Sequence, residues 1–201
     1  MLRPTICAVL LSVAMIVPTF AQQSPPTRIR GTVEKFDDHT LSVKSRDGKS
    51  VTITLAPDFT VRAVVAETLN DIKPGDKVGI TSVKGPDGTR QAVEIHIFPA
   101  ALSTVRMGEF PWDLGAGSLM TNAPVAEVSS APQGRTIKLS LNGKEEVIVV
   151  PPGTPIVTYE PGDPALLKPG AAVFVLARKE PNGSLAAASV TAEKNGVRPP
   201  M

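Results

Sequence analysis

The chain has 201 residues with 21 basic and 19 acidic side chains, and its formal net charge of +2 implies no strongly charged partner such as nucleic acid. Its single cysteine, Cys7, lies in an apolar N-terminal segment, so the rest of the chain offers no thiol for catalysis, thiolate metal sites or disulfides. Only 4% of the residues are aromatic, whereas 16 glycines and 20 prolines are typical of short strands joined by tight turns.

Residues 1–21 have the pattern of a secretory signal peptide. Arg3 precedes an apolar stretch over residues 6–17, which is shorter than the roughly 20 residues that a membrane-spanning helix needs. Thr19-Phe20-Ala21 then has the small-x-small pattern of a cleavage site. We expect cleavage after Ala21, an N-terminal extension over residues 22–28, and a periplasmic or secreted protein. A retained membrane anchor is the alternative interpretation.

Residues 29–98 are predicted to form a first small β-barrel repeat. Apolar and polar residues alternate in short runs, and Asp47-Gly48 predicts a type I′ hairpin between two of them. Residues 65–72 could form one or two helical turns, and Pro74-Gly75 suits the centre of a type II turn. The predicted strands cover residues 29–35, 41–43, 51–55, 78–83 and 92–98, and a further strand after Pro57 runs through Val61.

The same order of turns recurs 95 residues later. Four turn sequences match at this offset, and apolar strand positions between them match as well, so we interpret the chain as a tandem repeat. The matches are Asp47-Gly48-Lys49 with Asn142-Gly143-Lys144, Pro57 with Pro152, Ile72-Lys73-Pro74-Gly75 with Leu167-Lys168-Pro169-Gly170, and Pro86-Asp87-Gly88 with Pro181-Asn182-Gly183.

The second repeat is placed at residues 125–195, with a C-terminal tail over 196–201. Its predicted strands cover residues 125–128, 137–141, 147–150, 156–159, 173–177 and 186–191. Short strands in such number can remove their sheet edges by closing into a barrel. We therefore predict an all-β protein made of two tandem small β-barrels of the OB or SH3-like kind, each folding on its own apolar face. An open sandwich shared between the copies is the alternative.

Residues 99–124 belong to neither copy and are predicted to be a linker with a docked loop. This segment contains the only tryptophan, Trp112, close to Phe110 and Asp113. Large aromatic side chains bury much surface, so we expect Phe110 and Trp112 to pin the linker against one or both barrels. Stacking on a ligand is the alternative, and Phe110, Trp112 and Asp113 are the candidate contacts for a ligand or partner.

The first copy resembles the small repeat domain of the DUF5666 family, which occurs in exported bacterial proteins and has no assigned activity. The matching residues are Gly31-Thr32-Val33, Leu41-Ser42-Val43, Asp47-Gly48 and the run from Asp71 to Val78. The whole chain also resembles a set of secreted alphaproteobacterial proteins with two repeats. The second copy has Ala171 where the first has Asp76, which argues against a site shared by both copies. The resemblance implies no catalytic residue.

The candidate metal ligands are Asp37, Asp38 and His39, whose oxygen and nitrogen donors could hold a divalent cation. An ordinary solvated turn is the competing interpretation, because Asp and His tolerate turn conformations. The second histidine, His96, alternates with apolar residues and shares a strand face with Glu94, so we expect these two side chains to form a solvent-facing pair.

Enzyme and nucleic-acid functions find little support in the sequence. A G-x-S-x-G elbow is missing, and Gly115-Ala116-Gly117 lacks the Lys-Ser/Thr ending of a phosphate loop. Residues 28–98 carry 11 basic and 10 acidic residues, so they provide no basic groove for nucleic acid.

We therefore expect an exported, non-enzymatic binding or assembly module of the bacterial cell envelope without a cofactor, whose partner is an envelope protein, a glycan or a small ligand. A periplasmic metal or small-ligand carrier is the second hypothesis, and an unrecognised hydrolase is the third.

Overall fold

The computed structural model describes residues 25–102, 105–131 and 134–200, and these residues form an almost purely β-structure. The predicted signal peptide and the first part of the N-terminal extension lie outside the described residues. Two 3-10 turns interrupt the strands, η1 (Leu69–Asp71) and η2 (Pro164–Leu166). The strands are β1 (Thr27–Asp37), β2 (Thr40–Ser45), β3 (Ser50–Ala66), β4 (Lys77–Lys84), β5 (Arg90–Phe98), β6 (Gly108–Pro111), β7 (Leu119–Ala131), β8 (Gly134–Leu141), β9 (Lys144–Val150), β10 (Ile156–Gly162), β11 (Ala172–Lys179) and β12 (Leu185–Ala192).

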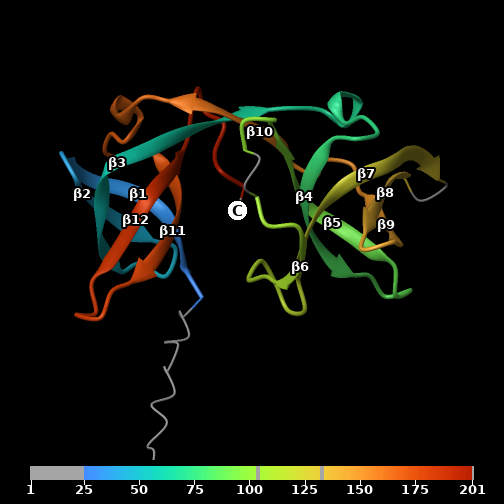
Figure 1. The fold of residues 1–201 in the computed structure, drawn as a ribbon, viewed down its shortest axis with the longest axis horizontal. Coiled ribbons are helices and arrows are strands. Elements are labelled where there is room, and N and C mark those ends of the chain that lie inside the picture. The colour runs from blue at the N-terminus through green and yellow to red at the C-terminus, as the bar shows by residue number, and fades with distance from the viewer. Residues whose placement is uncertain (1–24, 103–104, 132–133, 201) are drawn as a thin grey trace, which may run out of the picture.

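The first lobe is a closed five-stranded β-barrel formed by β1, β2, the first part of β3, β12 and β11 (Figure 1). Apolar side chains alternate along each strand and point inward, as Leu41 and Val43 do in β2. Closing the sheet leaves no exposed edge and buries one continuous core. This core includes Ile29, Val33, Leu41, Val43, Ile53, Leu55, Val173, Val175 and Val190.

The second lobe is formed by β4, β5, β9, β8 and β7, and β6 adds to the outer side of β7. Its ring of pairings closes between β5 and β9 through only two residue pairs, Arg90 with Ile148 and Gln91 with Val149. The core of this lobe includes Val78, Ile80, Ile95, Ala123, Val125, Ile137, Leu139, Ile148 and Ile156.

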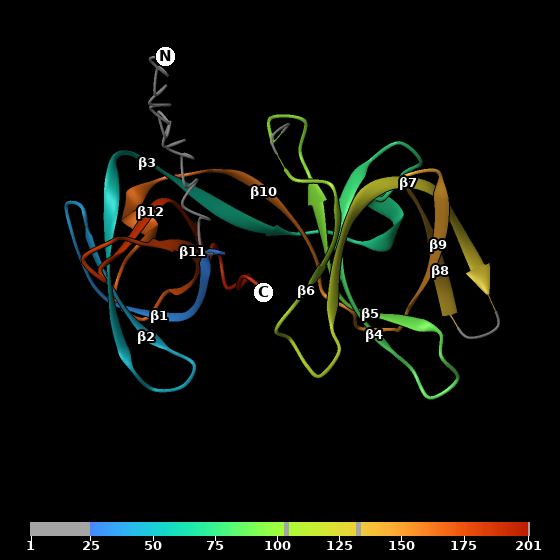
Figure 2. The same ribbon diagram turned by 60° about the horizontal axis from the view of Figure 1, so that its bottom comes forward.

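The strand pairing does not follow the predicted domain boundaries at residues 29–98 and 125–195. β1, β2 and β3 from the first half of the chain close their barrel with β11 and β12 from the second half, whereas β4 and β5 join β7, β8 and β9. Each lobe is therefore a composite of both halves, and neither half folds on its own apolar face. The physical reason is β3, which continues for 17 residues and leaves the first lobe instead of turning back (Figure 2).

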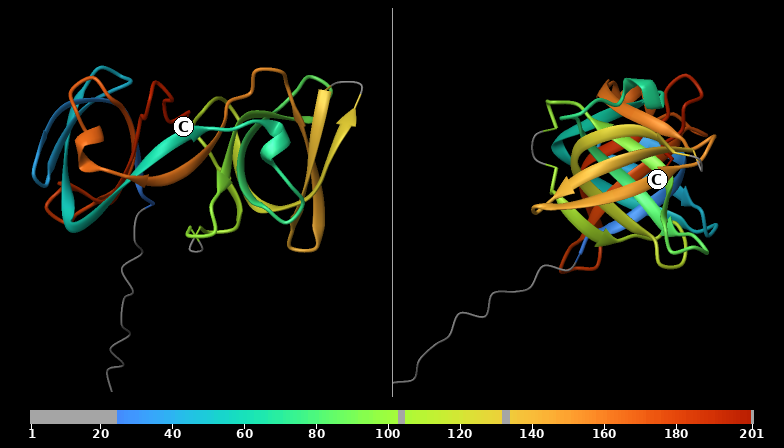
Figure 3. Two further views of the ribbon diagram at one scale, coloured as in Figure 1. Left: turned by 90° about the horizontal axis from the view of Figure 1, so that it is seen from above. Right: turned by 90° about the vertical axis from the view of Figure 1, so that its right-hand side faces the viewer.

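The two lobes are connected by a pair of antiparallel strands, the end of β3 and β10, which cross between them (Figure 3). Val157 pairs with Ala66, and Pro161 pairs with Arg62. An offset of 95 converts the first pair into the second, because 66 becomes 161 and 157 becomes 62. The crossing therefore lies on a pseudo-two-fold axis that relates the two lobes. The same offset converts the Leu185–Ile53 pair of the first lobe into the Arg90–Ile148 pair of the second.

The turns follow the sequence predictions with one exception. Gly75 has a φ of 93°, and the Asp76 amide donates to the Lys73 carbonyl at 3.1 Å, as a type II turn requires. Asn142 and Gly143 both have positive φ, which fits a type I′ hairpin. The hairpin at Asp47-Gly48 is not type I′, because only Gly48 has positive φ. The Gly48 amide there donates to the Ser45 carbonyl, so the loop is one residue longer than predicted.

Candidate functional site

The predicted metal ligands lie in the turn between β1 and β2, at the end of the first lobe. The Asp37 carboxylate accepts from Lys35 at 2.9 Å, and the His39 imidazole lies 3.7 Å from the exposed Asp38 carboxylate. The His39 ring packs edge-on against Phe59 at 5.8 Å. Within the described ranges, no group of three or more His, Cys, Asp or Glu side chains could hold a metal ion. The His39 ring instead covers the Phe59 side chain.

Two of the linker residues singled out from the sequence lie against the first lobe. The Asp113 carboxylate accepts two hydrogen bonds from the Arg30 guanidinium, at 2.7 and 2.8 Å, and the Arg28 guanidinium stacks 3.8 Å from the Trp112 ring centre. The Arg30 side chain is only 9% exposed, and its guanidinium also lies 5.0 Å over the Phe174 ring. These contacts attach the loop after β6 to β1.

The same contacts set the charge of Asp113. Partial burial would raise the pKa of its carboxyl, but the hydrogen bonds and positive charge of Arg30, together with Arg28, outweigh burial and lower the pKa. Phe110 remains with the second lobe, where β6 pairs with β7 and the Arg106 guanidinium lies 4.4 Å over its ring. Trp112 and Phe110 thus contact different lobes.

The prediction that Glu94 and His96 form a solvent-facing pair is wrong, since both side chains are only 1% exposed. They do share one face of β5, opposite the core residue Ile95, and on that face the Tyr159 ring stacks on His96. The Thr81 hydroxyl donates to the Glu94 carboxylate at 2.6 Å, and the Tyr159 hydroxyl lies 2.6 Å from the His96 Nδ1. Local alternation identified the shared face correctly but could not reveal what covers it.

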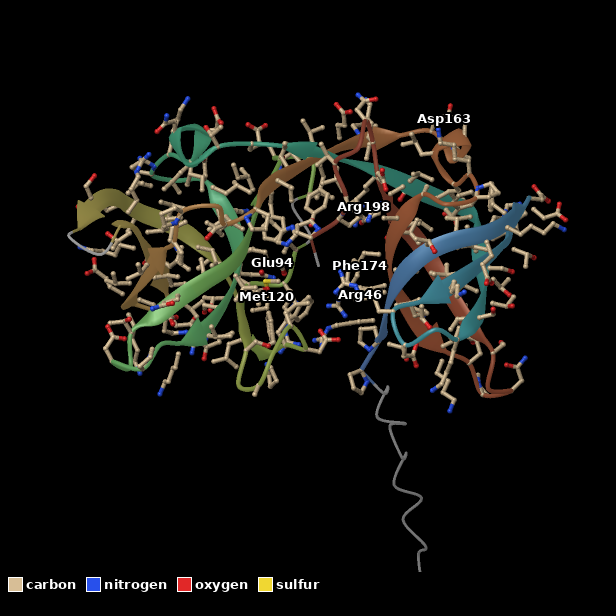
Figure 4. The ribbon with its side chains drawn as sticks, turned by 180° about the vertical axis from the view of Figure 1, so that it is seen from behind. Arg46, Glu94, Met120, Asp163, Phe174 and Arg198 are labelled. Carbon is tan, nitrogen blue, oxygen red and sulfur yellow. The ribbon has the colours of Figure 1, made fainter. Side chains whose placement is uncertain are left out.

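This buried polar cluster lies on the side of the second lobe that faces the first. Figure 4 shows Glu94 and Met120 there, opposite Phe174, Arg46 and Arg198. The Tyr159 ring stacks on His96 at 5.7 Å, and burial raises the pKa of the Tyr159 hydroxyl far above its ordinary value. A phenol that is kept neutral in this way orders β10 against β5. The cluster therefore holds the crossing strand β10 against the second lobe through polar contacts.

A hollow of about 550 Å³ opens at the end of the second lobe. We call it the second-lobe hollow. Its lining is mostly apolar and comes from the turn over residues 151–154 together with Leu69, Arg135, Val150 and Ile156. Sequence reasoning did not find it, because the lining residues lie far apart in the chain. Its volume is in the range of small-ligand sites, which is roughly 300–1,000 Å³.

Two polar groups mark the rim of this hollow. The Arg135 guanidinium donates to the Asn70 side-chain oxygen at 2.6 Å, which fixes its direction. Partial burial and the neighbouring Asp71 carboxylate raise the pKa of Glu67. Glu94 and His96 do not line the hollow, so Glu67 is the one carboxyl or imidazole among its described lining residues.

The equivalent end of the first lobe is filled by an aromatic side chain. The offset of 95 relates the Val190–Val61 pair of the first lobe to the Ile95–Ile156 pair of the second. By the same offset, Phe59 lies at the position of Thr154. The His39 carbonyl accepts a hydrogen bond from the Leu55 amide, and Arg135 pairs with Val150, which is the counterpart of Leu55. His39 therefore corresponds to Arg135. Phe59 packs on the core against Phe36, with ring centres 5.9 Å apart. Thr154 is too small to fill the same space.

A smaller hollow of about 420 Å³ lies on the side of the first lobe, between β3, β11 and β12. It includes Leu176, which is one of two exposed large apolar side chains in the described ranges. Its lining also contains the charged pair of residues Arg178 and Glu180.

Comparison of the chain with protein-family models, with curated proteins and with solved structures finds no match. In the described part of the chain, no helix is long and apolar enough to cross a membrane.

Proposed function

We propose that the protein is an exported, non-enzymatic binding module of the bacterial cell envelope that contacts its partner through the second-lobe hollow. The observation that carries this proposal is the difference between equivalent lobe ends. Phe59 fills the end of the first lobe, whereas Thr154 leaves about 550 Å³ open in the second. An open, mainly apolar concavity with a few polar groups is the form that binding sites usually take.

Export and the repeat are parts of the same proposal. The signal-like residues 1–21 favour a periplasmic or secreted location, and the shared offset of 95 in the two lobes supports an origin by duplication. The resemblance to DUF5666 domains fits both features. Duplication supports binding in particular, because a second copy of a stable lobe can lose a core side chain while the first copy keeps it.

A non-enzymatic role is favoured over hydrolysis by where the reactive groups lie. Glu94 and His96 are 1% exposed and are held by Thr81 and Tyr159, away from the hollow. A general acid or base must reach the substrate proton within hydrogen-bond distance, and these side chains face a covered surface.

The second candidate is a carrier of a small ligand, and the volume of the second-lobe hollow is the observation that favours it. A small-molecule ligand would occupy the hollow by itself, whereas a protein partner would also cover the exposed residues around it. The two candidates therefore differ in what can be crosslinked at the rim.

The experiment is photo-crosslinking in living cells that export the protein. A photoreactive side chain replaces Pro152, which is exposed at the hollow. The control position is Asp58, which is exposed on the equivalent stretch of β3 in the first lobe. We expect a discrete adduct with an envelope protein from position 152 only. The absence of an adduct, or equal adducts from both positions, would rule out the proposed contact surface.

A further inference from the structure

The two lobes provide an internal precedent for what the second-lobe hollow accepts. In the first lobe the corresponding space holds a benzyl group that comes from an extended strand, since Phe59 lies in the middle of β3. In the second lobe the equivalent segment has left the strand, because β9 ends at Val150 and β10 begins at Ile156. The hollow is thus a barrel end in which Thr154 takes the place of Phe59.

The segment that leaves the strand explains why the chain cannot fill the hollow itself. Residues 151–155 contain three prolines, which have no amide hydrogen to continue the strand pairing. The Thr154 hydroxyl instead donates to the Pro151 carbonyl at 2.8 Å, which closes a local turn. Thr154 is therefore held back toward its own turn and not toward the core.

The residue at the rim has changed in a way that matches an aromatic occupant. His39 covers Phe59 edge-on in the first lobe, and Arg135 stands at the equivalent place in the second. A guanidinium stacks on aromatic faces and attracts them through their quadrupole. The hydrogen bond from Arg135 to Asn70 orients this group in advance, which reduces the ordering cost of binding.

We propose that the second-lobe hollow binds an aromatic side chain presented by an extended segment of a partner protein, which packs on Leu69, Val150 and Ile156 beneath the Arg135 guanidinium. This inference rests on the proposed binding function and names the chemistry of the partner. The occupant is a protein side chain because the group that fills the equivalent space in the first lobe is itself one, carried on an extended backbone.

The test is an NMR titration of the exported protein, purified from the periplasm, with three amino-acid probes. The probes are N-acetyl-phenylalaninamide, N-acetyl-tryptophanamide and N-acetyl-leucinamide, so that apolar burial alone is represented by leucine. We expect the aromatic probes to shift the amide signals of residues 150–156 and Arg135. We expect the leucine probe to bind roughly tenfold more weakly, because it lacks the stacking contact.

Two variants decide whether the shifts report the hollow. Thr154→Phe places an aromatic ring where Phe59 lies in the first lobe, and it should abolish the response to the aromatic probes. Thr154→Ser keeps the hydroxyl and the open space, so it should respond as the original protein does. A leucine response equal to the aromatic one, shifts elsewhere on the protein, or an undiminished response in Thr154→Phe would overturn the inference.

The outcome separates this inference from the proposed function. An adduct at position 152 without a preference for aromatic probes would keep the binding function and reject the aromatic occupant. A preference for aromatic probes without an adduct would keep the chemistry of the hollow and reject an envelope protein as its partner.

Discussion

The ends of the two lobes differ in the side chains at their centre and rim, although the strands that build them share their register. In the first lobe, Phe59 lies between Phe36 and His39 and completes the core. In the second lobe, Thr154 takes the equivalent position and bonds to its own turn, which leaves a hollow. The comparison teaches that two lobes with the same strand register can differ in whether an equivalent position is filled from within the chain.

Each lobe is a composite of both halves of the chain, and separating the halves should have the largest effect on folding. Residues 25–98 expressed alone should not form a folded monomer, because β1, β2 and β3 would lack β11 and β12. Analytical ultracentrifugation with circular dichroism would detect either an unfolded chain or a strand-exchanged dimer. A well-folded monomer of this fragment would contradict the composite architecture.

Opening the first lobe should be the next largest effect. Phe59→Thr removes an aromatic side chain that is half-buried on the core, so we expect a loss of about 2 kcal/mol in the free energy of unfolding, below the range for fully buried phenylalanine. Urea denaturation measures this loss. Thr154→Ser is the matched control and should change stability by less than about 0.5 kcal/mol. If both substitutions lower the free energy of unfolding equally, the two lobe ends are packed alike.

The contact between the linker and the first lobe should respond to pH. The pKa of Asp113 is lower in the folded protein than in the unfolded chain, so its contribution to stability is present above the ordinary carboxyl pKa and disappears as the pH falls through the lowered value. Asp113→Asn should cost about 1 kcal/mol at neutral pH, a modest figure because the side chain is 45% exposed to solvent.

Denaturation at neutral and acidic pH tests this contribution. The difference in stability between the original protein and Asp113→Asn should shrink as the pH falls below about 4. Asp58→Asn is a suitable control, because Asp58 is an exposed carboxylate in the middle of β3. A pH-independent difference would mean that Asp113 acts through packing instead of charge.

The smallest expected effect is a gain. Thr154→Phe should stabilise the second lobe by about 0.5–1 kcal/mol, since it fills a hollow lined by apolar side chains. Thermal unfolding followed by circular dichroism measures the change. A clear loss of stability would indicate that the turn closed by the Thr154 hydroxyl cannot release the ring into the hollow, and that the two ends are built differently.

Much of the local structure follows from the sequence. Alternation located most of the strands and the helical turn before Pro74 was expected, but β6 and the first part of β7 lie within the predicted linker over residues 99–124. The type I′ hairpin predicted at Asp47-Gly48 is found at the equivalent Asn142-Gly143. These features depend on residues close together in the chain, whose backbone preferences and periodicity are local properties. The placement of Glu94 and His96 on one strand face was predicted for the same reason, whereas their burial was not.

Only the tertiary structure decided which strands share a barrel. The two halves have similar strands, so β3 can be completed by strands of either half with the same apolar pattern, and the pattern does not distinguish these choices. The second-lobe hollow arises in the same way, because Leu69, Arg135 and Thr154 meet only after the exchange. The sequence by itself determined the strands and their turns, and the long-range pairing of β3 decided the lobes, the buried polar cluster and the site.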